Sequence, residues 1–190
     1  MEYTDIEIAE IRTRQEEAKF KDIYDGEVRC GGEVLFFEKV NLYENRFSVM
    51  LPNTYMDLPG SMAKLKYPME NRPPVIKTNY NTTVNFAFGY YQQEFFEEHV
   101  ESAANGLQAG MGRIYPGIRF FETRLMETQT GVKLSCFEFI SPALDMELYQ
   151  LFGFVPIHNR FLHFIFNAPS KLMQSWQPVA LQVLQSICNI

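Results

Sequence analysis

VKLSCFEFI (132–140), MELYQLFGF (146–154) and RFLHFIF (160–166) are three apolar segments that follow one another along the chain. The breaks between them contain Ser141-Pro142 and residues 156–159, and both breaks are typical of turns. Each segment is therefore predicted to be a β-strand. Because consecutive strands connected by short turns pair antiparallel, this stretch predicts a mainly antiparallel sheet.

More strands are predicted on the N-terminal side of this stretch. The predicted strands are residues 34–40, 47–51, 75–78, 84–90 and 118–128. The first two alternate apolar and polar residues around a turn at 41–45, which indicates a hairpin. Residues 53–74 are rich in Pro, Met and Asn without a sustained period, so they predict a long loop with one short strand near Leu65.

Two segments have the apolar spacing of an amphipathic helix. The apolar stripe of the first comprises Phe96, Val100, Ala103, Ala104, Leu107 and Met111, and that of the second comprises Trp176, Val179, Ala180, Val183, Leu184 and Ile187. The first helix is predicted to begin at Gln93 and the second at about Ser175. Trp176 is predicted to anchor the second helix to the sheet.

The N-terminal residues predict a further, acidic helix. Thr4 and Glu7 form a capping-box pattern, and the helix is expected to end at about Tyr24. Residues 1–22 contain seven acidic and four basic residues. We therefore predict an appended helix at 1–24 and a single α+β domain at 25–190.

Composition excludes several classes of protein. The chain has 190 residues, of which 46% are hydrophobic, so it can form a sizeable core without a metal or a disulfide. A net charge of −6 argues against binding to nucleic acid or to an anionic membrane. No apolar run approaches the ~20 residues of a membrane span, and the first residues do not resemble a signal peptide. We therefore expect a cytoplasmic protein without membrane insertion.

Several short stretches resemble one family. They are the strand Phe47-Ser48-Val49-Met50-Leu51-Pro52, the following Tyr55-Met56-Asp57, Lys66-Tyr67-Pro68, the Asn-Phe-x-Phe strand at 85–88, and the terminal helix from Trp176 to Gln185-Ser186-Ile187. Together with the order of the elements, they are similar to the PsbP-like superfamily over residues 33–190. The family includes photosystem II extrinsic subunits, a small Ran-binding import factor and bacterial DcrB-like domains.

The resemblance implies an α/β/α sandwich with a mainly antiparallel sheet, to which the N-terminal helix would be an addition. It also implies a function in binding other proteins, as an adaptor, an assembly factor or a chaperone for secreted cargo. The family has no catalytic motif that could be matched to residues of this chain. DcrB-like members are commonly lipoproteins, and this chain lacks their lipobox.

Several residues whose side chains could act in catalysis or bind a metal or a phosphate have simpler structural interpretations. Glu94, Glu97, Glu98 and Glu101 lie opposite an apolar stripe, as solvated residues do, and His99 belongs to the same surface. The odd spacing of His158 and His163 places them on opposite faces if both lie in a strand. Gly106, Gly110 and Gly112 end a helix and are followed by no phosphate-binding residues. Cys30, Cys136 and Cys188 are too far apart for a typical zinc site.

We therefore expect no enzymatic activity, no cofactor and no metal. The segment 52–77 is the strongest candidate for function, because it is basic in an acidic chain and rich in Met and Tyr, which suit protein interfaces. The predicted binding residues are Tyr55, Met56, Met62, Lys64, Lys66, Tyr67, Met69 and Arg72. The alternative is that Met56, Leu58 and Tyr67 fold back to cap the sheet.

Three functional hypotheses follow from these observations. The first is a non-enzymatic adaptor or chaperone that binds another protein, linked to bacterial secretion or envelope assembly. The second is a domain that binds a small apolar ligand between the sheet and the mid-chain or C-terminal helix. The third is a structural subunit that forms homo-oligomers through the N-terminal helix.

Overall fold

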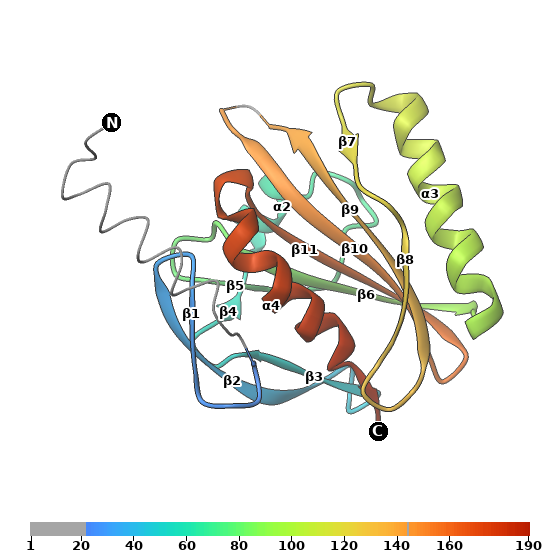
Figure 1. Ribbon diagram of the computed structural model, residues 1–190, viewed down its shortest axis with the longest axis horizontal. Helices are drawn as coiled ribbons and strands as arrows, with labels where there is room; N and C mark the ends of the chain where they lie inside the picture. The colour runs from blue at the N-terminus through green and yellow to red at the C-terminus, as the bar shows by residue number, and fades with distance from the viewer. Residues whose placement is uncertain (1–21, 144) are drawn as a thin grey trace, which may run out of the picture.

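The computed structural model describes residues 22–143 and 145–190. Its strands form two sheets, and all strand pairs in this part of the chain are antiparallel. Figure 1 shows one helix lying across the strands near the centre and a second helix along one side of the molecule.

The larger sheet is built around the three segments that predict it. Its strands are β4 (Met56–Asp57), β5 (Val75–Thr78), β6 (Asn85–Glu94), β7 (Arg119–Phe120), β8 (Arg124–Glu127), β9 (Lys133–Pro142), β10 (Glu147–Ile157) and β11 (Arg160–Pro169). Their order is β4-β5-β6-β11-β10-β9-β7, and β8 also pairs with β9. The antiparallel β9-β10-β11 arrangement confirms the prediction from residues 132–166.

The smaller sheet contains the predicted hairpin. Its strands are β1 (Glu27–Cys30), β2 (Glu33–Leu42), β3 (Phe47–Pro52) and β12 (Cys188–Asn189), in the order β1-β2-β3-β12. The hairpin is confirmed, because β2 pairs antiparallel with β3. It belongs to a sheet of its own and is not an extension of the larger one. In β2, Leu35 is buried, whereas Val34 and Phe36 are exposed.

Helices cover both faces of the larger sheet. They are α2 (Gly60–Lys66), the 3₁₀ turn η1 (Glu97–His99), α3 (Val100–Ile114), the 3₁₀ turn η2 (Ser170–Leu172) and α4 (Met173–Gln185). One face packs against α4 and the smaller sheet, and we call it the α4 face. The opposite face, called the α3 face, packs against α3 over β9 and β10 and against α2 over β5, β6 and β11. These layers confirm the predicted α/β/α sandwich.

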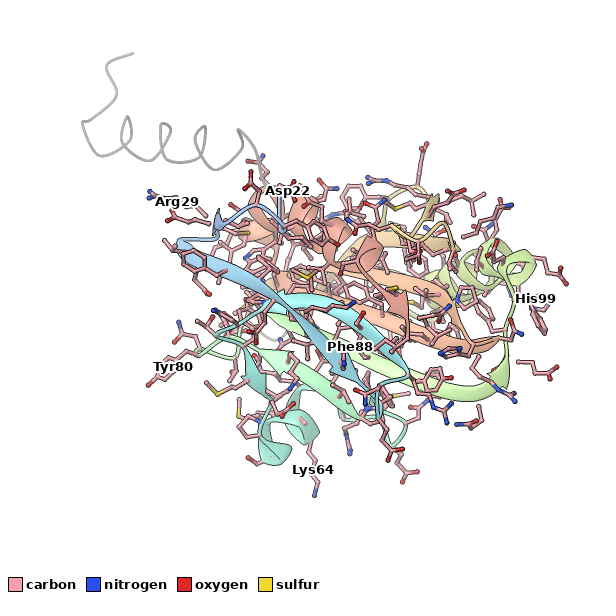
Figure 2. All side chains as sticks on the ribbon, turned by 90° about the horizontal axis from the view of Figure 1, so that it is seen from below. Asp22, Arg29, Lys64, Tyr80, Phe88 and His99 are labelled. Atoms are coloured by element: carbon pink, nitrogen blue, oxygen red, sulfur yellow. The ribbon has the colours of Figure 1, made fainter. Side chains whose placement is uncertain are left out.

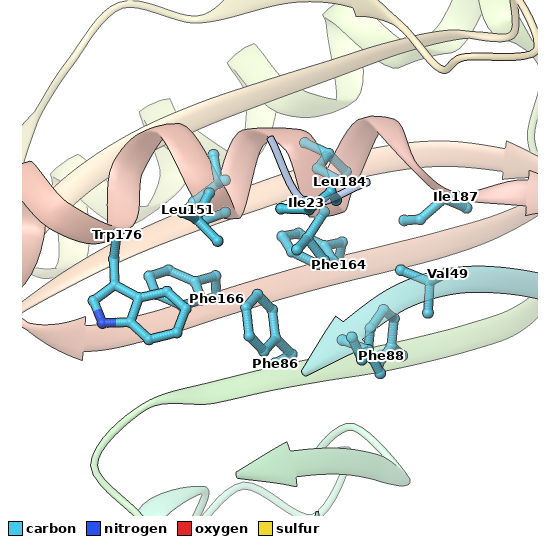
Figure 3. Close-up of a cluster of buried hydrophobic side chains, with 14 of the residues drawn as sticks. Ile23, Val49, Phe86, Phe88, Leu151, Phe164, Phe166, Trp176, Leu184 and Ile187 are labelled. Carbon is cyan, nitrogen blue, oxygen red and sulfur yellow. The ribbon is translucent and has the colours of Figure 1, made fainter. Parts of the chain in front are cut away.

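The α4 face contains the main hydrophobic core (Figure 3). Trp176, Leu184 and Ile187 point from α4 and its C-terminal end towards the strands. Every residue of the predicted stripe of α4 is buried. Since Trp176 is fully buried against Phe86 and Phe166, its predicted role as an anchor is confirmed.

Several elements differ from the sequence prediction, among them the two-residue strands β4 and β12, which are not predicted. Residues 60–66 form the short helix α2, where a loop and a strand near Leu65 are predicted, and Leu65 itself is exposed. β1 is not predicted at all, and the predicted strand 118–128 is divided into β7 and β8. The helix predicted from Gln93 begins at η1, because β6 continues to residue 94.

Residues 1–21 of the predicted acidic helix lie outside the described residues. At its predicted end, Ile23 and Tyr24 lie in a turn and not in a helix. Ile23 is buried in the main core, and its amide donates a hydrogen bond to Oε1 of Gln182 at 3.0 Å. The packed domain therefore includes residue 23, two positions before the predicted boundary.

Candidate protein-binding surface

The structure divides the eight predicted binding residues into two groups. Tyr55, Met62, Tyr67 and Arg72 are half-buried, and Met56, Lys64, Lys66 and Met69 are exposed. The half-buried group fits the alternative that the segment caps the sheet, and the exposed group fits the alternative that it forms a binding surface.

Tyr55 packs into the main core on the α4 face. Its ring centroid lies 5.8 Å from that of Phe86 and 6.3 Å from that of Trp176. Burial raises the pKa of its hydroxyl, and the oxygen has no hydrogen-bond partner among the described residues. Tyr55 is thus a core residue and does not contribute to an exposed surface.

Met62, Tyr67 and Arg72 hold α2 and the following loop on the sheet. Met62 and Tyr67 pack against a small cluster around Ile76. The hydroxyl of Tyr67 accepts a hydrogen bond of 2.6 Å from Nδ2 of Asn167, and burial raises the pKa of this tyrosine to about 12. Arg72 Nε donates to the backbone oxygen of Tyr67 at 2.9 Å. These three residues cap the α3 face.

The other four residues project from the cap together with a fifth that the prediction omits. Leu65, at the end of α2, is 74% exposed, and Met69 is 64% exposed. Met56, Lys64 and Lys66 are exposed as well. α2 contains no fully buried residue, and its side chains at 64–66 are exposed.

Tyr80 is the most exposed large hydrophobic residue of the described chain, at 87%. It lies in the turn between β5 and β6, and Figure 2 shows it at one end of the molecule, opposite His99. Asn79 Oδ1 accepts hydrogen bonds from the amides of Thr83 and Val84, at 2.9 and 3.1 Å. The backbone of the turn is therefore ordered by the side chain of Asn79, and Tyr80 projects from it into solvent.

Two contacts join this turn to α2 and β4. Lys66 Nζ donates a hydrogen bond to the backbone oxygen of Thr82. Met56 pairs with Thr78 in the ladder between β4 and β5. We use the name Tyr80 surface for the exposed residues of these adjoining segments, which are Met56, Lys64, Leu65, Lys66, Met69 and Tyr80.

The Tyr80 surface is basic within an acidic protein. Lys64 and Lys66 have no ion-pair partner among the described residues. The nearby Lys77 is neutralised by Asp57, with 2.7 Å between Nζ and Oδ1. Because the whole chain has a net charge of −6, this surface is the part that an acidic partner would select.

The other residues considered for chemistry lie elsewhere. The four glutamates of the mid-chain region and His99 are exposed, as their position opposite the apolar stripe predicts. His158 lies in an exposed turn, whereas His163 lies in β11. Among the described residues, no group of three or more His, Cys, Asp or Glu side chains could hold a metal ion.

Glu138 is a buried carboxylate that the sequence pattern does not reveal. Its Oε2 accepts hydrogen bonds from the hydroxyl of Tyr149 at 2.5 Å and from Nε2 of Gln177 at 2.6 Å. Arg124 Nη2 lies 2.8 Å from Oε1, in an ion pair without hydrogen-bond geometry. These contacts connect the first turns of α4 to the sheet, so the cluster stabilises the packing of α4.

None of the helices among the described residues combines the length and the apolarity needed to cross a membrane.

Comparison by sequence finds no matching protein-family model and no matching curated protein. Comparison by structure finds solved relatives. Cyanobacterial PsbP (CyanoP) from Synechocystis sp. PCC 6803 has a TM-score of 0.58 at 10% identity, covering 85% of this chain and 98% of that chain. This likeness shows that the chain has the PsbP-like fold, as the sequence resemblance implies.

Two other solved structures are similar at lower scores. The Ran-binding protein Mog1p from Saccharomyces cerevisiae has a TM-score of 0.49 at 10% identity, covering 82% of this chain and 96% of that chain. A protein of unknown function from Pseudomonas aeruginosa, PA94, has a TM-score of 0.45 at 10% identity, covering 81% of this chain and 97% of that chain.

Proposed function

We propose that this PsbP-like domain is a non-enzymatic adaptor or chaperone that binds an acidic, partly apolar segment of another protein through the Tyr80 surface. The observation that carries the proposal is the presentation of Tyr80. A large aromatic side chain, 87% exposed, stands on a turn that Asn79 holds in one conformation. Because hydrogen bonds already order the backbone of this turn, a partner that covers Tyr80 has to immobilise only the two side-chain torsions of the residue.

The neighbouring side chains suit the same role. Leu65, Met69 and Met56 are exposed apolar side chains of the neighbouring segments, and thioether side chains adapt to partners of different shapes. Tyr is enriched among the residues that dominate binding energy at interfaces. The surface provides aromatic, aliphatic and ammonium groups, and these groups can bind a peptide. The six residues of the surface do not form the pair of a nucleophile and a general base that covalent catalysis needs.

Charge supports an acidic partner. The two exposed lysines attract carboxylates at long range, and this attraction should weaken as salt screens it. The setting that the sequence resemblance suggests is a bacterial secretion or envelope system, with the adaptor in the cytoplasm.

Site-specific photo-crosslinking in the native host tests the proposal. The full chain would carry p-benzoylphenylalanine in place of Tyr80, and a matched chain would carry it in place of Leu125, an exposed residue of β8. We expect a protein adduct of defined mass from position 80 and none of that mass from position 125. Charge reversal by Lys64→Glu together with Lys66→Glu should reduce the yield at position 80.

Two results would contradict the proposal. The first is the same set of adducts from positions 80 and 125. The second is a position-80 adduct whose yield does not change on charge reversal, since the lysines would then have no part in recognition.

A further inference from the structure

A pocket opens on the α3 face between the C-terminal end of α3 and the sheet. Its volume is about 270 Å³. Met111 of α3 and Ile118 of the following loop form one side, and Phe139 of β9 and Phe152 of β10 form the floor. The pocket does not include any residue of the Tyr80 surface, so its function is independent of the proposed protein binding.

The floor of the pocket has the geometry of an aromatic site. The rings of Phe139 and Phe152 lie 4.9 Å apart at 85°, so one presents a face where the other presents an edge. A third ring that enters the pocket can contact the half-buried ring of Phe152, whereas Phe139 is only 1% exposed and supports Phe152 from below. The thioether of Met111 makes favourable contacts with aromatic rings as well.

The polar side-chain groups that line the pocket are the hydroxyl of Tyr115 and one hydrogen-bonded pair, Gln150 and Ser141. Gln150 Nε2 donates to the hydroxyl of Ser141 at 2.8 Å, and both residues line the pocket. This bond leaves Oε1 of Gln150 as an acceptor without a partner among the described residues. A ligand with one N–H or O–H group on an aromatic ring would satisfy that acceptor.

Volume limits the ligand further. A cavity of ~150 Å³ lined by Leu, Ile and Phe is large enough to bind benzene. The present pocket, about 270 Å³ and open to solvent, therefore has room for a bicyclic ring. It lies between the sheet and the mid-chain helix, which is one of the two places where the sequence predicts an apolar ligand.

We infer that this pocket binds a small planar aromatic compound that carries one hydrogen-bond donor, oriented by Gln150. Indole is a suitable probe because it combines a bicyclic ring with a single N–H donor. Its N-methyl derivative keeps the ring but cannot donate. For a ligand of nine heavy atoms, the expected Kd of indole lies between about 10 µM and 1 mM.

The experiment is an NMR titration of the full chain labelled with ¹³C in the methionine methyl groups. Met111 reports on the pocket, and Met69, exposed on the Tyr80 surface, is the internal control. We expect a saturable shift of the Met111 methyl signal with indole and no saturable shift of Met69. 1-Methylindole should bind roughly fivefold more weakly, since it lacks one hydrogen bond.

Two variants distinguish binding in the pocket from nonspecific binding of indole elsewhere on the protein. Gln150→Leu keeps the volume and removes the acceptor, so it should weaken indole roughly fivefold and leave 1-methylindole unchanged. Ile118→Phe fills the pocket and should abolish the Met111 shift, whereas Leu125→Phe on exposed β8 should not. If Ile118→Phe does not fold, the Gln150→Leu variant still tests whether indole binds in the pocket. A wild-type chain without a saturable Met111 shift, or a Gln150→Leu chain with unchanged selectivity, overturns the inference.

Discussion

His163 lies within a group of aromatic rings on the α3 face. Its ring centroid is 4.9 Å from that of Phe152, 5.4 Å from that of Phe154 and 5.8 Å from that of Phe161. Its Nε2 is buried without a hydrogen-bond partner among the described residues. Burial therefore favours the neutral ring and lowers the pKa of His163 to about 4.

This burial makes the stability of the fold depend on pH. In the unfolded chain the pKa of His163 returns to about 6.5, so the unfolded state binds the additional proton between pH 6.5 and 4. The contribution of neutral His163 to the free energy of unfolding is fully present above pH 6.5. It is lost progressively as the pH falls from 6.5 to 4. Urea denaturation at pH 7 and pH 4 should show a loss of roughly 2–4 kcal/mol from this residue.

His163→Phe provides the matched comparison, because a phenyl ring fits among the neighbouring aromatic side chains. The variant should lose less unfolding free energy than the wild type between pH 7 and pH 4. An identical loss in both chains would show that the pH dependence has another origin.

Single tyrosines illustrate the limit of sequence prediction. Tyr55 and Tyr80 both come shortly after strand-like segments, yet one packs against the core and the other projects from a turn. The Asn79-x-x-x-Thr83 pattern is a signal for the turn, because an Asn side chain accepts hydrogen bonds from amides that follow it. No local pattern places Tyr55 against Trp176, since that contact depends on the tertiary packing of α4.

At the scale of elements, length decides how well the sequence predicts the structure. β9, β10, β11 and α4 each have ten or more residues, and all are predicted. α2 has seven residues and none of them is buried, so no apolar stripe marks it as a helix. β1 has only four residues and is held by its pairing with β2.

α4 depends on Trp176. The residue is fully buried, and a Cβ added at Gly31 would lie only 2.6 Å from its indole Nε1. The turn between β1 and β2 therefore approaches the indole through a residue without a side chain. Because Gly31 also has a φ of +59°, glycine suits this position for two reasons.

Trp176→Ala should lower the unfolding free energy by about 3–5 kcal/mol, because it removes a large buried side chain and leaves a cavity. Urea denaturation followed by circular dichroism measures the change, since the chain has only one Trp and the variant loses its fluorescence. Tyr115→Ala, at a 54% exposed position, is the control and should change stability by less than about 1 kcal/mol. Equal effects of the two substitutions would contradict an anchoring role.

The start of the domain can be located by truncation. A chain that begins at residue 22 keeps Ile23, and a chain that begins at residue 25 loses it. Ile23 is 2% exposed, so the shorter chain should be less stable by about 1.5–3 kcal/mol. Thermal and urea denaturation of the two chains measure the difference directly. Equal stabilities would place the boundary after residue 24, as the sequence predicts.

At the scale of the molecule, the two faces of the larger sheet have different functions in this account. The α4 face is covered by α4 and the smaller sheet and contains the main core. The α3 face is covered by α2 at one end and α3 at the other, and the candidate pocket adjoins α3. Strand order predicts the antiparallel sheet and the resemblance to the PsbP-like superfamily implies the layers, but the coverage of each face depends on contacts between distant segments.

The central claim is that Tyr80 dominates the binding of an acidic partner. The most direct measurement is the Kd of the crosslinked partner, purified, for the wild type, for Tyr80→Ser and for the control Leu125→Ser, by isothermal titration calorimetry. The account predicts that Tyr80→Ser weakens binding by about 30-fold, as loss of an interface hot spot does, and that Leu125→Ser leaves the Kd unchanged. A Kd for Tyr80→Ser within twofold of the wild-type value would contradict it.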